Sequence, residues 1–182
     1  MKFASYRYKP SDKPRFGFKR DKYIVDVVKC ANWLNEKKGD AIFLDIPSSL
    51  KECLKNWSIN FELLNKLDAL ITDEDIIEMR KIDKPIANLE SDLELLAPVP
   101  NPQSFRDFYA FEQHVRSARK LRGLEMHPDW FKIPIFYFSN SVALFGHRQK
   151  INYPSGTDEL DFELEFAAVS YTHLRAHETV VY

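Results

Sequence analysis

The sequence predicts an α+β protein, and three observations carry this prediction. Short β-like segments come first, amphipathic helical segments follow up to about residue 81, and β-like sequence returns after a proline-rich stretch near residue 100. With 182 residues, the chain is long enough for one sizeable core or for one core plus a small domain.

The composition is that of an ordinary globular protein. Hydrophobic residues make up 45% of the chain and charged residues 29%, and the net charge of −1 gives no global field that favours nucleic acid or an anionic membrane. The N-terminus is too polar for a signal peptide, and no apolar run approaches the length of a membrane span. Cys30 and Cys53 lie in helix-like sequence and are expected to be buried thiols. We therefore expect a cytoplasmic protein with no nucleic-acid or membrane partner.

The elements of the first part follow from turn and capping residues. Phe3–Tyr8 and Arg15–Lys19 are predicted strands around a Pro-Ser-Asp-Lys-Pro turn, and Tyr23–Val28 continues the pattern. Serine, aspartate and glycine at the ends of apolar-periodic runs predict the helices. These are Ala31–Lys38 ending at Gly39, a helix capped by Ser48 or Ser49 and running to about Asn56, Ile59–Ile71, and Glu74–Lys81 capped by Asp73.

A domain boundary is predicted in the segment Leu93–Pro102. Strand-like sequence there ends in three prolines at alternate positions, which neither a helix nor a central strand accepts. The prediction is a small N-terminal domain over residues 1–92 and a β-rich domain over residues 93–168. In the second domain we expect one helix over Gln103–Arg122, opened by Ser104, and strands within Trp130–Phe138, Ser141–Phe145 and Lys150–Tyr153.

An acidic segment near the end of the chain is the first candidate for chemistry. If Leu160–Phe166 is a strand, alternation puts Asp161, Glu163 and Glu165 on one face and apolar side chains on the other. Three carboxylates in a row repel one another unless water solvates the face or a cation neutralises it. Oxygen ligands suit Mg²⁺, Mn²⁺ or Ca²⁺, so the segment is either a metal site or a solvated acidic strand.

A second candidate lies in the predicted helix. Asp107 and His114 are seven residues apart, which places them two turns apart on one helix face. The alternative is a surface helix on which Asp107 is merely polar and His114 is solvated.

Three ordered motifs resemble the fumarylacetoacetate hydrolase family. They are Asp107-Phe108-Tyr109 followed by Gln113-His114; then Pro128, Trp130, Pro134 and Tyr137; then, after Gly146 and the Pro154-Ser-Gly156 turn, the segment Leu160–Glu165. The resemblance covers about residues 95–169. It implies that the second domain is the first part of a mixed β-sandwich roll of the fumarylacetoacetase type.

The resemblance also implies roles for individual residues. Asp107, Glu163 and Glu165 would hold a divalent metal ion, with Mg²⁺ the first choice and Mn²⁺ or Ca²⁺ as alternatives, whereas Asp161 is not a ligand in the family. His114 would be the general base that takes a proton from water. Tyr109 and Tyr137 would bind the substrate. Its carboxylate would be bound by Arg116, Arg119 or Arg122, of which the spacing favours the last two.

The implied activity is metal-dependent hydrolysis of a carbon–carbon bond in a β-diketone or acylpyruvate-type acid, as in aromatic catabolism. The same family contains isomerases and decarboxylases of α-keto and enol acids, and the quoted residues are common to all of them. The alternative from another class is a non-catalytic cation-binding domain. Family members commonly form homodimers, so we expect one for the full-length protein.

The resemblance stops after Ala168. Family members continue with a long stretch that supplies another metal-binding Asp and a catalytic Lys. Here Val169–Thr179 instead matches a one-frame translation of the transposon-derived adaptor used in sequencing libraries. The prediction is that residues 169–182 are a non-native tail and that the chain is an inactive fragment.

Overall fold

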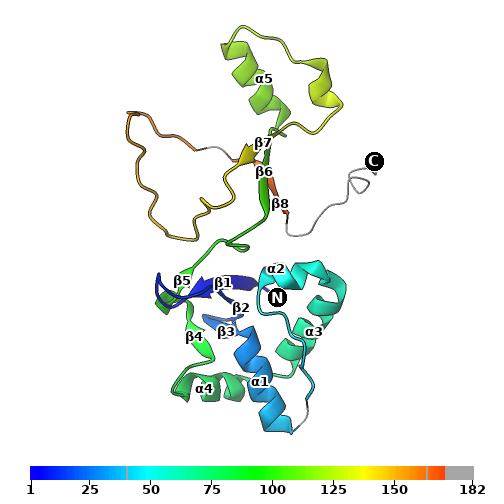
Figure 1. Ribbon diagram of the computed structural model, residues 1–182, viewed down its shortest axis with the longest axis vertical. Helices are drawn as coiled ribbons and strands as arrows, with labels where there is room; N and C mark the ends of the chain where they lie inside the picture. The colour runs from blue at the N-terminus through cyan, green and yellow to red at the C-terminus, as the bar shows by residue number, and fades with distance from the viewer. Residues whose placement is uncertain (40, 163, 171–182) are drawn as a thin grey trace. The chain divides into compact units, whose positions relative to one another are not determined.

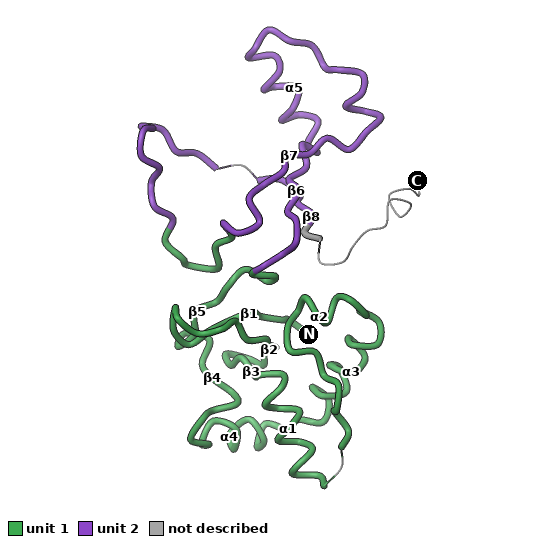
Figure 2. Tube along the Cα trace, viewed as in Figure 1, with its two compact units in different colours: residues 1–100, 144–150 green, residues 101–143, 151–182 purple. Residues whose placement is uncertain are grey.

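The computed structural model describes residues 1–39, 41–162 and 164–170. The chain divides into two compact units, drawn in different colours in Figure 2. The first unit comprises residues 1–100 together with 144–150, and the second comprises residues 101–143 and 151–182. Both helices and antiparallel strands are present, so the α+β prediction is confirmed. The fumarylacetoacetase-type roll stays a prediction.

The first unit is built on a five-stranded antiparallel sheet in the order β4-β3-β2-β1-β5 (Figure 1). The predicted strands near the N-terminus are confirmed, although the third ends two residues early because a helix begins at Val27. The strands are β1 (Phe3–Arg7), β2 (Arg15–Arg20), β3 (Tyr23–Asp26), β4 (Ala87–Leu89) and β5 (Glu94–Leu95), with a short 3₁₀ turn η1 (Glu90–Asp92) before β5.

Four helices accompany this sheet: α1 (Val27–Lys38), α2 (Leu50–Lys55), α3 (Trp57–Ala69) and α4 (Asp73–Lys81). Helix α1 starts earlier than predicted because the Asp26 carboxylate accepts a hydrogen bond from the Lys29 amide and caps the helix. It ends as predicted at Gly39, which has φ +70°, a conformation that glycine adopts without strain. Ser49 caps α2, and Thr72, rather than the expected Asp73, caps α4.

The core of the first unit lies between the helices and one face of the sheet. Phe16 and Phe18 alternate with Gly17 along β2, so both rings point to this face, where α1 contacts β2 and β3. Cys30 and Cys53 are buried free thiols, as expected, and burial raises the pKa of each. The largest fully buried core side chains include Phe18, Val25, Leu34, Leu64, Leu67 and Met79.

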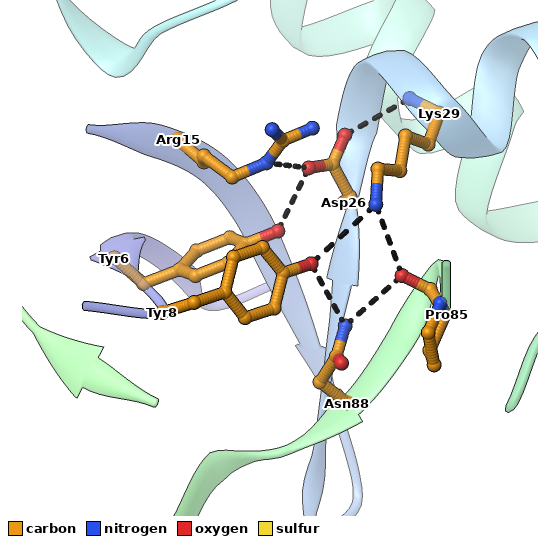
Figure 3. Close-up of polar contacts among 7 residues, drawn as sticks. All are labelled: Tyr6, Tyr8, Arg15, Asp26, Lys29, Pro85 and Asn88. Carbon is orange, nitrogen blue, oxygen red and sulfur yellow. Dashed lines mark hydrogen bonds and ion pairs between the residues drawn. The ribbon is translucent and has the colours of Figure 1, made fainter. Parts of the chain in front are cut away.

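A polar network occupies the other face of the same sheet (Figure 3). The Asp26 carboxylate, with only 3% of its side chain exposed, accepts hydrogen bonds from the Tyr6 hydroxyl at 2.8 Å and from Arg15 Nε at 2.7 Å. Burial and the neighbouring Asp26 charge raise the pKa of Tyr6, so Tyr6 remains a donor. Asp26 therefore links β1, β2 and the start of α1 through one buried carboxylate.

The second unit contains a three-stranded antiparallel sheet in the order β7-β6-β8. The strands are β6 (Ser104–Phe108), β7 (Phe136–Ser139) and β8 (Phe166–Ser170); helix α5 (Glu112–Leu121) follows β6, and a 3₁₀ turn η2 (Pro128–Phe131) precedes β7. Asp107 lies on the central strand β6 and is paired on both sides, with Tyr137 on β7 and with Ala167 on β8.

The predicted helix over Gln103–Arg122 is wrong in its first half. Residues 104–108 form β6, because pairing with strands on both sides outweighs local helical periodicity. The predicted strands at Ser141–Phe145 and Lys150–Tyr153 are likewise absent from these described segments. Of the predicted acidic strand, residues 160–162, 164 and 165 lie before β8, which begins only at Phe166.

The described part of the chain contains no helix that could span a membrane. None of its helices combines the length and the apolar character that crossing a bilayer requires.

Candidate metal and catalytic site

Asp107 and Tyr137 face the same cavity in the second unit. They are direct cross-strand partners in β6 and β7, so their side chains leave the sheet on one face. The cavity has a volume of 220 Å³, and Glu165 also lines it. Its remaining walls are apolar or aromatic: Phe108, Tyr109, Ile135 and Phe136.

Glu165 is the most unusual side chain of this site. Only 7% of it is exposed, and its Oε2 atom is buried without a hydrogen-bond partner among the described residues. A buried carboxylate oxygen without a partner costs free energy because it loses water and gains nothing in return. Glu165 lines the same cavity as Asp107, so a cation bound between the two carboxylates would remove that cost.

His114 lies on the other side of Glu165. It is in the first turn of α5, and its Nε2 atom is 3.6 Å from Glu165 Oε1. The two side chains also line a second cavity of 310 Å³, together with Phe111, Phe162 and Leu164. Glu165 thus connects the cavity that contains Asp107 with the cavity that contains His114.

Tyr109 joins β6 to the helix that carries His114. Its ring packs edge-on against the His114 ring, with centroids 5.6 Å apart. Its backbone is held at both ends: the amide donates to Ile135 O at 3.1 Å, and the carbonyl accepts from Trp130 Nε1 at 2.9 Å. Sequence reasoning assigned no role to Trp130, and the only signal for it was its place in the motif around Pro128 and Pro134.

Arg119 and Arg122 do not line either cavity. Near the end of α5, Arg119 Nε donates to the Glu125 carbonyl and Arg122 Nε donates to the Ala118 carbonyl at 3.1 Å. The structure therefore does not bring these two side chains together with Asp107 and Glu165 in the described residues.

The remaining acidic residues separate into two cases. Asp161 is exposed, and its carboxylate accepts a hydrogen bond from the adjacent Phe162 amide at 2.8 Å. Glu163, a predicted metal ligand, lies outside the described residues. Among the residues that are described, no three His, Cys, Asp or Glu side chains form a ready metal cluster. Asp107 and Glu165 are two of the three residues predicted as metal ligands.

These residues fit a divalent cation better than a purely solvated face. Carboxylates are the oxygen ligands that Mg²⁺, Mn²⁺ and Ca²⁺ prefer, and one of the two is buried with an oxygen that no described residue satisfies. The nearby imidazole and phenol side chains add a base and a hydroxyl group. This combination of groups can bind a metal-chelating acid and move a proton beside it.

Comparison with known protein families finds a match over the second part of the chain. Residues 103–181 match the family model described as "Fumarylacetoacetate (FAA) hydrolase C-terminal". The matched range begins just before β6 and includes Asp107, His114 and Glu165. It also extends over most of the segment 169–182, for which the non-native origin stays a prediction. No curated protein sequence matches the chain significantly.

Proposed function

The chain belongs to the fumarylacetoacetate hydrolase family through residues 103–181, and from this premise we propose that it carries part of a metal-dependent active site for keto or diketo acids. The scaffold of this family serves hydrolases, isomerases and decarboxylases. Within that range we propose hydrolysis of a carbon–carbon bond in a β-diketone or acylpyruvate-type acid. The observation that carries the proposal is that Glu165 lines the same cavity as Asp107 and that its buried Oε2 atom has no hydrogen-bond partner among the described residues.

In the proposed site, Asp107 and Glu165 hold the metal ion, and Glu163 is the third ligand that the family resemblance implies. When bound, such an ion supplies Lewis-acid polarisation of a keto or enol oxygen. The negative charge of the two carboxylates favours a divalent over a monovalent cation. The central position of β6 keeps Asp107 in place, because this strand pairs on both sides.

His114 is the proposed general base. An imidazole nitrogen that carries no proton can take one from a neighbouring water molecule. The Glu165 carboxylate, 3.6 Å from Nε2, stabilises the imidazolium that forms once the proton has moved. The edge-on Tyr109 ring limits rotation of the imidazole, and its backbone hydrogen bonds keep that ring in place.

Tyr137 is the proposed substrate-binding group. Its hydroxyl group can donate to a keto or carboxylate oxygen, and it stands directly across from Asp107. The aromatic and aliphatic walls of the cavity suit the hydrocarbon part of such an acid. Arg119 and Arg122 remain proposed carboxylate-binding residues on the resemblance alone, because neither lines the cavities.

The non-catalytic alternative, a simple cation-binding or acidic surface domain, requires Asp107 to lie far from the acidic segment. Asp107 and Glu165 instead line one cavity, with Tyr137 in the same cavity and His114 on the far side of Glu165. This arrangement supports an active site over a solvated acidic face.

A substrate panel distinguishes the reactions that the scaffold allows. Protein expressed from the complete reading frame is incubated with an acylpyruvate, a dienoate keto acid and oxaloacetate, each with Mg²⁺ or Mn²⁺. We expect cleavage of the acylpyruvate into two acids. Chromatography of the products measures this cleavage. Release of CO₂ from oxaloacetate alone, or double-bond migration alone, would replace the hydrolase proposal with the decarboxylase or isomerase alternative.

A further inference from the structure

A cavity of 640 Å³ lies in the first unit, and none of the groups proposed for catalysis takes part in it. One wall consists of the 3₁₀ turn η1 and strand β5, and the other consists of residues 145–150, which return to this unit from much later in the chain. A volume of about 300–1,000 Å³ is typical of small-molecule sites. The cavity therefore has the size of a ligand site.

The returning segment, residues 144–150, packs tightly against β5. A Cβ atom at Gly146 would lie 2.1 Å from the Leu95 carbonyl oxygen, so only glycine allows this approach. The Gly146 amide donates to the Gln149 side chain, whose Nε2 donates in turn to Glu94 Oε1. The wall is thus held to the sheet by close packing and by two linked hydrogen bonds.

The acidic groups of the cavity already have partners. Arg7 makes a bidentate pair with Glu94, with both N–O distances at 2.7 Å. This pair, followed by the Gln149 hydrogen bond, lowers the pKa of Glu94 to about 2. Glu90 pairs with Lys19. Arg7 and Lys19 therefore neutralise both carboxylates from within the first unit.

The basic groups of the cavity lack such partners. Arg148 and Lys150 both line it, and within the described residues neither forms an ion pair. Arg148 has φ +60°, an uncommon conformation for a residue with a side chain. With the carboxylates neutralised, these two cations give the cavity a net positive charge, and His147 adds a further donor.

The remaining lining is apolar. Leu93 and Leu95 come from the sheet side, and Phe145, 51% exposed, comes from the returning segment. We propose that this cavity binds a small organic anion, with its carboxylate or phosphate group at Arg148 and Lys150 and its apolar body against Leu93, Leu95 and Phe145. This function goes beyond the proposed reaction and uses none of its residues.

The proposal is tested by titrating the whole chain separately with phenyl phosphate, with phenylacetate and with uncharged benzyl alcohol. Isothermal titration calorimetry measures binding, and amide NMR chemical shifts locate it. We expect saturable binding of at least one anion and none of benzyl alcohol, with shifts at residues 90–95 and 145–150. Preference for phenyl phosphate identifies a phosphate ligand, and preference for phenylacetate identifies a carboxylate ligand.

Variants provide the control. The double change Arg148→Gln and Lys150→Gln should weaken anion binding about tenfold or more, because charge-assisted hydrogen bonds are lost. Lys81→Gln with Lys84→Gln removes two exposed charges of the same unit outside the cavity and should leave binding unchanged. Absence of saturable binding, equal binding of benzyl alcohol, or equal weakening by both double variants would overturn the proposal.

Discussion

Replacing His114 by asparagine is expected to lower the turnover number for an acylpyruvate about 10²–10⁴-fold in protein expressed from the complete reading frame. Asparagine retains a polar side chain of similar size but cannot take a proton from water. The substitution should lower kcat more than it raises KM, because His114 is proposed to act on the water rather than to bind the acid. Steady-state kinetics over a range of pH measures both parameters.

His127→Asn is the matched control for this change. His127 lies outside both cavities of the site, and its Nδ1 accepts a hydrogen bond from the Asp129 amide, which an asparagine side chain can also accept. We expect kcat to be unchanged. Full activity of His114→Asn, with a preserved fold, would refute the role of His114 as base.

The largest expected effect on stability is at Asp26. Replacing it by alanine leaves the buried Tyr6 hydroxyl without its acceptor and Arg15 without its carboxylate, and it removes the cap of α1. Breaking a buried pair costs about 3–5 kcal/mol and losing a cap costs about 1 kcal/mol. Because Arg15 is 36% exposed, we expect a total near the lower end, about 3 kcal/mol.

Urea denaturation of the first unit, followed by the fluorescence of Trp33 and Trp57, measures this loss. Asp26→Asn should have a smaller effect because asparagine still caps the helix and still accepts from Tyr6. Asp45→Ala, a change at an exposed carboxylate, should alter the free energy of unfolding by less than about 0.5 kcal/mol. A loss at Asp26 no larger than at Asp45 would show that the network of Figure 3 contributes little stability.

The sequence predicts the first unit well because its signals are local. Strand alternation at Phe16 and Phe18, the Ser49 cap and the glycine stop at position 39 each act within a few residues. The start of α1 was missed because the capping Asp26 also ends a strand, so a continuing β pattern concealed the cap.

The second unit was predicted less well because its strands depend on distant partners. Residues 104–108 follow a helical spacing, yet they pair with β7 and β8, which lie much later in the chain. Asp107 and His114 were expected on one helix face, but one is on a strand and the other on the following helix. The proximity of His114 to Glu165 had no local signal, since it arises only when β8 pairs with β6.

Binding of Mn²⁺ tests the central claim, that Asp107 and Glu165 are ligands of a divalent metal, most directly. The whole chain is titrated with Mn²⁺, and free Mn²⁺ is measured by its electron paramagnetic resonance signal. We expect saturable binding of Mn²⁺, and Mg²⁺ should displace the bound Mn²⁺. Asp107→Asn and Glu165→Gln should each weaken it about 100-fold or more, whereas Asp129→Asn, a change at an exposed carboxylate outside both cavities, should leave it unchanged. No saturable binding, or equal affinity in the Glu165→Gln variant, would contradict the account.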